Sequence, residues 1–223
     1  MTNFDLYNLL NFIVNKDVYA QAIRPQDFDL ELKAKNIRHL RKRIGLPETY
    51  IPGSANEGVG ITRVNDIDLL PFFVEEEVTP VGQIVSLTQD WYYILDWYTS
   101  ASITSDLIGV EEVSNRVRNF ITAPTLSHPC AYIVPEGLKV FPTGITSKVT
   151  VLYYRWPVTP VFLIKDITED NLEVEYDADS SVELEWDDGN KLDILSMILQ
   201  DMGLNIERQD VVQLAAKLVQ QGK

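Results

Sequence analysis

The spacing of apolar residues changes twice along the chain, and the first zone predicts helices. Apolar side chains at positions 4–14 lie on nearly every side of the predicted helix. Such a helix must be buried by packing against other elements. Thr2 or Asn3 is a candidate cap for it. Pro25 opens a second predicted helix, with acids near its start and bases near its end, as the helix dipole favours. Residues 1–50 are therefore expected to form an N-terminal helical pair.

In the middle of the chain apolar and polar residues alternate with a period of two, which predicts strands. The predicted strands are 69–74, 83–87, 91–98, 131–134, 138–141, 148–155 and 161–165. Pro-Glu-Gly at 135–137 predicts a hairpin turn. One helix, 110–120, interrupts the strands. We expect a β-rich domain over residues 66–181, an antiparallel sandwich or barrel-like domain with one inserted helix, preceded by a glycine-containing linker at 51–65.

The last zone returns to helical spacing. Asp187 or Asp188 is predicted to cap a helix that ends near Gly203, and a final helix is predicted to begin at Asn205 or Glu207. Residues 182–223 are therefore expected to form a C-terminal αα-hairpin. The whole pattern predicts an α+β fold.

Composition places the chain among soluble globular proteins. It is 45% hydrophobic and 23% charged, and Cys130 is its single cysteine, so no intrachain disulfide is expected. The start lacks the features of a signal peptide, and no apolar run is long enough to cross a membrane. We expect a protein made and kept in a reducing cytoplasm, with no membrane partner. A net charge of −14 argues against a general nucleic-acid binder and favours solubility.

Candidate chemistry is sparse. His128 and Cys130 would share a strand face, but Pro129 separates them and no third orienting group is near. The acidic stretch DADSSVELEWDD, at 177–188, has Val182 where a calcium loop needs glycine. The stretch GSANEGVG lacks the Gly-Lys-Ser/Thr ending of a phosphate loop. We therefore expect no enzyme activity, no catalytic residue, no cofactor and no bound metal.

The sequence contains one basic cluster, KAKNIRHLRKR, which includes Arg38, Arg41, Lys42 and Arg43. These side chains are candidates for contact with phosphate or with an acidic partner. The alternative is a solvated helix face that follows the helix dipole, with His39 on the same face.

Three blocks of the chain resemble virion structural proteins of crAss-like tailed phages. They are the opening FDLYNLLNFIVNKD…PQDFDLELKAKNIRHLRKRIGLPETYIPG, the central APTLSHPCAYIVPEGLKVFP…KVTVLYYRWPVTPVF, and the final VELEWDDGNKLDILSMILQDMGLNIERQDVVQLAAKLVQQGK. The resemblance implies a head-to-tail connector or tail ring (adaptor) protein in a homo-oligomeric ring of twelve subunits. Its implied partners are the portal and neighbouring ring or tail proteins, with genomic DNA passing through the lumen without sequence-specific binding. Its implied location is the virion, and the host cytoplasm during assembly.

The stretch KVTVLYYRWPVTP, at 148–160, supplies candidate interface residues. Tyr153, Tyr154 and Trp156 are of the type enriched at interfaces, and Pro157 and Pro160 would pre-order the segment that follows. The alternative is that the aromatic rings fill the β core.

Two other functions remain open at this point. One is a cytoplasmic β-rich module that binds a small ligand or glycan through its aromatic side chains. The other is a hydrolase that uses acidic residues. A ring protein should assemble, a binding module should be a monomer that a small ligand saturates, and a hydrolase should lose turnover when single acids are changed.

Overall fold

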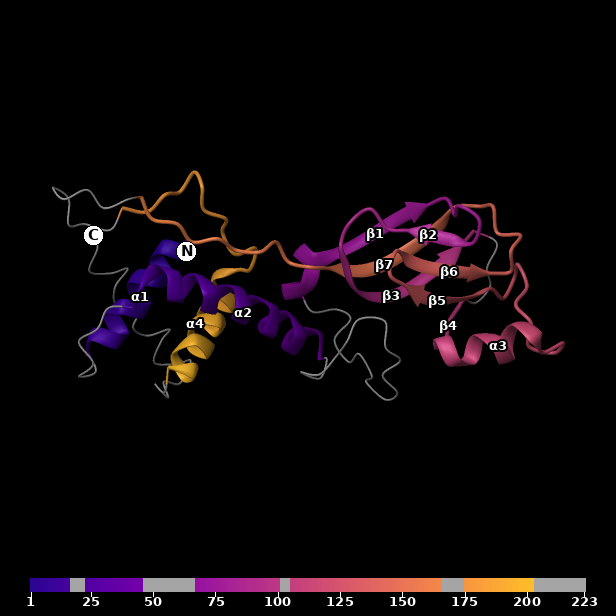
Figure 1. Cartoon of the computed structure of the whole chain (residues 1–223), viewed down its shortest axis with the longest axis horizontal. Helices are drawn as coiled ribbons and strands as arrows, with labels where there is room; N and C mark the ends of the chain where they lie inside the picture. Colours follow the sequence, from indigo (N-terminus) through magenta and orange to yellow (C-terminus); the bar gives the residue numbers. More distant parts are fainter. Residues whose placement is uncertain (17–22, 46–66, 101–104, 166–174, 203–223) are drawn as a thin grey trace. The chain divides into compact units, whose positions relative to one another are not determined.

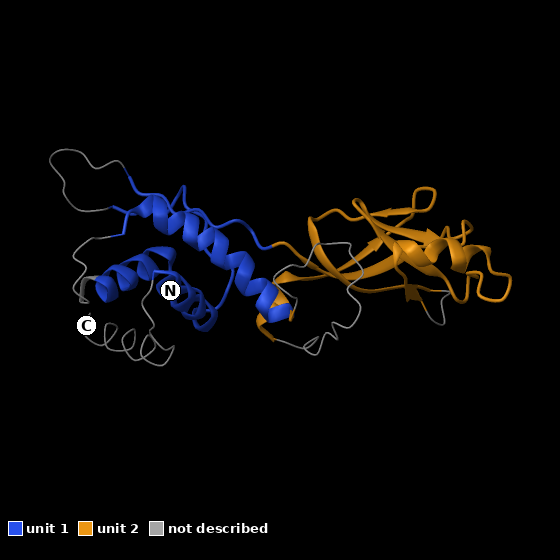
Figure 2. Ribbon diagram, turned by 60° about the horizontal axis from the view of Figure 1, so that its bottom comes forward, with its two compact units in different colours: residues 1–44, 157–223 blue, residues 45–156 orange. Residues whose placement is uncertain are grey.

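The chain folds into two compact units, each described here by itself. The computed structural model describes residues 1–16, 23–45, 67–100, 105–165 and 175–202. Unit 1 comprises Met1–Ile44 and Pro157–Lys223, and unit 2 comprises Gly45–Trp156 (Figure 2). Unit 1 is therefore built from two stretches of chain that unit 2 separates.

Unit 1 is helical. In the described residues its helices are α1 (Asn3–Lys16), α2 (Pro25–Ile44) and α4 (Asp188–Asp201), and α4 packs against both others. Leu10 of α1, Phe28 of α2 and Ile194 of α4 are fully buried. The rings of Tyr7, Phe28 and Phe162 lie within 5.0–5.4 Å of one another. Phe162 thus brings the segment after Pro157 into the same apolar core.

The helix ends in unit 1 follow the predicted capping chemistry. Thr2 Oγ1 accepts a hydrogen bond from the Asp5 amide at 3.1 Å, and the Thr2 amide donates to Asp5 Oδ2 at 2.7 Å, a reciprocal capping box. Asp187 caps α4 by accepting from the Asn190 amide at 2.8 Å. Asn3 caps nothing: its buried side chain donates to the Val182 carbonyl at 2.9 Å and ties the two stretches of unit 1 together.

Unit 2 contains two sheets (Figure 1). The first has the order β1-β7-β3 and is antiparallel, and the second has the order β2-β6-β5-β4, in which β4 is parallel to β5. The elements are η1 (Ile67–Phe72), β1 (Phe73–Val78), β2 (Ile84–Ser86), β3 (Trp91–Thr99), β4 (Asp106–Leu107), α3 (Val110–Arg118), β5 (Cys130–Val134), β6 (Gly137–Phe141) and β7 (Val149–Arg155).

The core of unit 2 lies between the two sheets. Trp97, Val151 and Tyr153 of the first sheet pack with Ala131 and Leu138 of the second, all with no exposed surface. This arrangement is the two-layer packing of a β sandwich. The α+β fold class, with its helical N-terminus, its sandwich, its inserted helix and a helix in the C-terminal zone, is confirmed.

Three features differ from the sequence prediction: two predicted strands and the domain boundaries. The predicted strand 69–74 is mostly the 3₁₀ helix η1, because Pro71 offers no N–H to a ladder and the buried Leu69 and Phe72 are three residues apart. The predicted strand 161–165 makes only two isolated bridges, Val161 with Val182 and Ile164 with Tyr176.

The third difference concerns the domain boundaries. The β-rich region was expected to extend to residue 181, but unit 2 ends at Trp156, because the segment after it pairs with and packs on unit 1. The N-terminal and C-terminal helical zones, expected as separate parts, belong to one unit. The predicted linker 51–65 and the predicted final helix lie outside the described residues.

Candidate functional site

The predicted aromatic segment divides between core and surface. Tyr153 and Tyr154 are 0% and 2% exposed, because β7 is the central strand of its sheet and both of its faces are covered. The structure therefore places these two rings in the β core, as the alternative interpretation had it, and corrects their assignment to a partner surface. Pro157 and Pro160 are also buried, within unit 1.

Trp156 is the one aromatic residue of that segment with an exposed part. Its ring centroid lies 4.3 Å from that of Tyr92, and its amide donates to the Asp90 carbonyl at 2.9 Å. The indole is thus fixed against Tyr92, and it also borders a pocket. This is the kind of position in which an aromatic side chain serves an interface.

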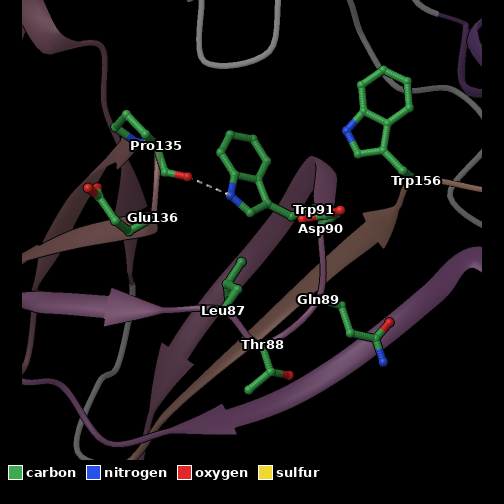
Figure 3. Close-up of a pocket in the computed structure, with 8 residues that line it drawn as sticks. All are labelled: Leu87, Thr88, Gln89, Asp90, Trp91, Pro135, Glu136 and Trp156. Carbon is green, nitrogen blue, oxygen red and sulfur yellow. Dashed lines mark hydrogen bonds between the residues drawn. The ribbon is translucent and has the colours of Figure 1, made fainter.

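The pocket beside Trp156 is acidic and aromatic (Figure 3). It has a volume of about 320 Å³ and is lined by Leu87, Thr88, Gln89, Asp90, Trp91, Pro135, Glu136 and Trp156. Trp91 is oriented by a hydrogen bond from its Nε1 to the Pro135 carbonyl at 3.3 Å. Its charged lining residues are Asp90 and Glu136, both acids, so the pocket favours a cationic or neutral group.

The hairpin turn predicted from Pro-Glu-Gly places two of these residues. Val134 pairs with Gly137 in the β5–β6 ladder, so Pro135 and Glu136 form the turn. Gly137 has φ of +139°, and a Cβ there would lie 2.4 Å from the Val85 carbonyl oxygen. Sequence reasoning found the turn and Trp156 but did not join them, because the pocket collects residues from three separate segments, 87–91, 135–136 and Trp156.

A second surface, which sequence reasoning missed, lies at α3 and the loop after it. α3 contains no buried residue, and Phe120 and Ile121 are 98% and 89% exposed. Other exposed apolar side chains of this region are Leu107, Val110 and Leu126. We call Arg118, Phe120, Ile121 and Leu126 the apolar tip. Val113, Val117 and Phe120 have helical spacing, yet none of the three is buried.

Hydrogen bonds hold the apolar tip in shape. The Ile121 amide donates to Asn119 Oδ1 at 3.0 Å, which forms a turn at the end of α3. The His128 amide donates to Thr125 Oγ1 at 3.1 Å. An ion pair between Arg116 and Asp106 attaches α3 to β4.

The basic helix has acidic partners within unit 1. Arg43 donates to Asn190 Oδ1 and lies 3.5 Å from Asp193 Oδ2, and Arg38 Nη1 lies 3.8 Å from Asp201 Oδ1. Arg41 is half-buried and Lys42 is exposed. Part of the basic cluster therefore serves the packing of α2 on α4.

His39 is buried, which corrects its expected place on a solvated face. Its ring packs edge-on to Trp186 at 4.7 Å, and its Nε2 lies 2.8 Å from Asn190 Oδ1. Burial lowers the pKa of His39, although the hydrogen bond with Asn190 opposes that shift. The residue is a structural part of unit 1.

The remaining chemical candidates are a buried cysteine and an acidic turn. Burial raises the pKa of the Cys130 thiol, so this side chain is less reactive than a free cysteine. The acidic stretch at 177–188 is a turn, with the Ser180 amide donating to Asp177 Oδ1 at 3.2 Å, followed by the cap of α4. Among the described residues, no group of histidines, cysteines or acids is arranged to hold a metal ion.

Comparison with known proteins adds no relative. No protein-family model matches the chain, and no curated protein matches it. Within the described part of the chain, no helix has the length and apolar character needed to span a membrane. The pocket and the apolar tip of unit 2 are the candidate contact surfaces of the chain.

Proposed function

We propose that the chain is a structural virion protein that forms a homo-oligomeric ring in the head-to-tail connector or tail of a short-tailed phage. The ring stacks on the portal or on adjacent ring proteins around the DNA channel. The subunit acts by shape and contact, and we assign it no catalytic residue.

The observation that carries this function is the apolar tip. Phe120 and Ile121 are neighbours with 98% and 89% of their surfaces exposed. Large apolar side chains that gather on a surface mark protein–protein contact sites. The tip includes no lining residue of the pocket, so unit 2 presents two chemically different surfaces, as a closed ring requires of each subunit.

The net negative charge of the chain supports a position of the ring around the DNA channel. The chain has a net charge of −14, and a lumen lined by such subunits repels a polyanion rather than binding it. The phage resemblance of the three sequence blocks is a second, independent support. Together they favour a channel component over a nucleic-acid-binding protein.

The pocket favours one alternative function. Trp91 and Trp156 border it together with Gln89, Asp90 and Glu136. Aromatic faces beside planar polar groups are also the means by which a small ligand or a glycan is bound. A β-rich binding module would be monomeric and would be saturated by such a ligand.

Light scattering and negative-stain imaging test the ring function, with the full chain alone and in purified phage particles. We expect ring-shaped assemblies and a reduced assembled fraction in the variant Phe120→Ser with Ile121→Ser. Val81→Ser is the matched control, because Val81 is 83% exposed but lies outside the apolar tip. Particles that lack the polypeptide would overturn the function, and a monomer that a sugar saturates would establish the alternative.

A further inference from the structure

We infer that subunits join head to tail, with the apolar tip of one copy seated in the acidic aromatic pocket of the next. This contact rests on the proposed ring function and assigns it a specific pair of surfaces. Its partner is a second copy of this chain. Arg118 and Phe120 are the side chains of the tip that enter the pocket.

The two surfaces lie at opposite ends of the four-stranded sheet. β5 begins at Cys130, where it pairs with β4 next to α3, and it ends at Val134, where the pocket turn begins. Its five residues span roughly 15 Å at about 3.3 Å each. Figure 1 shows α3 beyond the β4 edge of unit 2. A tip and a pocket at different ends of one unit can pair between copies in series, which is a heterologous contact.

Charge complementarity selects the tip as the occupant. Residues 113–135 contain Arg116 and Arg118 but no acid, in a chain with 33 acids in total. Arg116 is paired with Asp106, whereas Arg118 is exposed at the tip. The pocket offers Asp90 and Glu136 beside two indoles. A guanidinium is attracted both by carboxylates and by the face of a tryptophan ring.

The same contact offsets a problem that the composition creates. Subunits with a net charge of −14 repel each other when they approach at random. An arginine that meets two carboxylates at a defined place makes one orientation favourable and leaves others repelled. The acidic excess thus helps to select the orientation in which subunits assemble.

The shape of the two partners also agrees. The tip is held by the Asn119 turn and by the hydrogen bonds between Thr125 and His128, so little loop entropy is lost on docking. Trp91 is fixed by Pro135 and Trp156 by Tyr92, so the pocket walls are fixed as well. Aromatic and arginine side chains in such settings carry most of the binding energy of an interface.

A charge swap tests the contact in the full chain. Arg118→Glu alone and Glu136→Arg alone should each weaken self-association about tenfold or more, measured by sedimentation velocity over a range of concentrations. The double variant should recover most of the loss, because the pair is restored with reversed signs. Lys165→Glu has the same charge change as Arg118→Glu at a residue that belongs to neither surface, and should have no effect. Far-ultraviolet circular dichroism of each variant checks that it is folded.

Disulfide trapping provides a second measurement. A copy with Ile121→Cys mixed with a copy with Gln89→Cys should give a mixed disulfide, whereas Val81→Cys in place of Ile121→Cys should not. Wild-type protein that does not self-associate, together with cysteine variants that give no mixed disulfide, would overturn the contact. Rings that form equally well from all charge variants would also overturn it, while the ring function itself would stand.

Discussion

The hydroxyl of Tyr153 donates a 2.7 Å hydrogen bond to Oε2 of Glu76, across the ladder between β7 and β1. Tyr153 pairs directly with Val74, so Glu76 is its diagonal neighbour on the same face of the sheet. This bond satisfies the one polar atom of a fully buried ring. Glu76 also accepts from the Thr88 amide at 3.1 Å and so links the sandwich core to a wall of the pocket.

Removing this hydroxyl should destabilise unit 2. Tyr153→Phe leaves the Glu76 carboxylate without its buried partner, at an expected loss of about 1–2 kcal/mol in the free energy of unfolding. Urea unfolding followed by tryptophan fluorescence measures that loss. Tyr98→Phe is the matched control, since Tyr98 donates to Glu75 at 3.1 Å in an exposed pair and should change stability little. Equal effects of the two substitutions would contradict the role given to burial.

The turn that carries Glu136 should tolerate no side chain at its last position. Gly137→Ala brings a Cβ to 2.4 Å from the Val85 carbonyl oxygen at a φ of +139°, and should reduce the free energy of unfolding by about 1–3 kcal/mol. Gly144→Ala is the control, because nothing lies within 4 Å of a Cβ there. The denaturant midpoints of both variants give the answer. A Gly137 variant as stable as the Gly144 variant would show that the turn can be rebuilt without strain.

Unit 1 should lose stability as the pH falls below the ordinary pKa of histidine, about 6.5. Burial lowers the pKa of His39, so the unfolded state binds the proton more readily than the folded state does, and stability decreases on acidification. Arg43 and Lys42 act in the same direction, while Asn190 and Asp193 oppose them. Protonation would also add a donor at Nδ1, which has no partner among the described residues.

Thermal unfolding at pH 7.5 and 5.5, followed by helical circular dichroism, measures this dependence. His39→Gln should remove most of the difference between the two pH values. His128→Gln should retain it, because His128 is exposed and is the only other histidine in the sequence. Retention of the full acid effect in the His39 variant would assign it to other groups.

Local signals made much of the fold predictable. Thr2, Pro25 and Asp187 mark helix starts through hydrogen-bond and backbone chemistry that acts within four residues. The hairpin at 135–137 is likewise specified by its own residues. Such signals do not depend on what packs against the element.

The burial of His39 and the exposure of Phe120 were not predictable in this way. His39 lies in a run of basic residues, and Trp186 and Asn190, from a distant part of the chain, pack against it. Phe120 has helical spacing with Val113 and Val117, but its side chain is 98% exposed. Periodicity shows which side chains share a face, whereas the partner of that face comes from the tertiary fold.

The discontinuous makeup of unit 1 sets an order of events on the ribosome. Unit 2 is complete once Trp156 has been made, but α1 and α2 have to wait for α4, which ends at Asp201. At about 5–20 residues per second, the first two helices wait roughly ten to thirty seconds with their apolar faces uncovered. The nascent N-terminal helices are therefore the part of the chain that a chaperone would bind during translation.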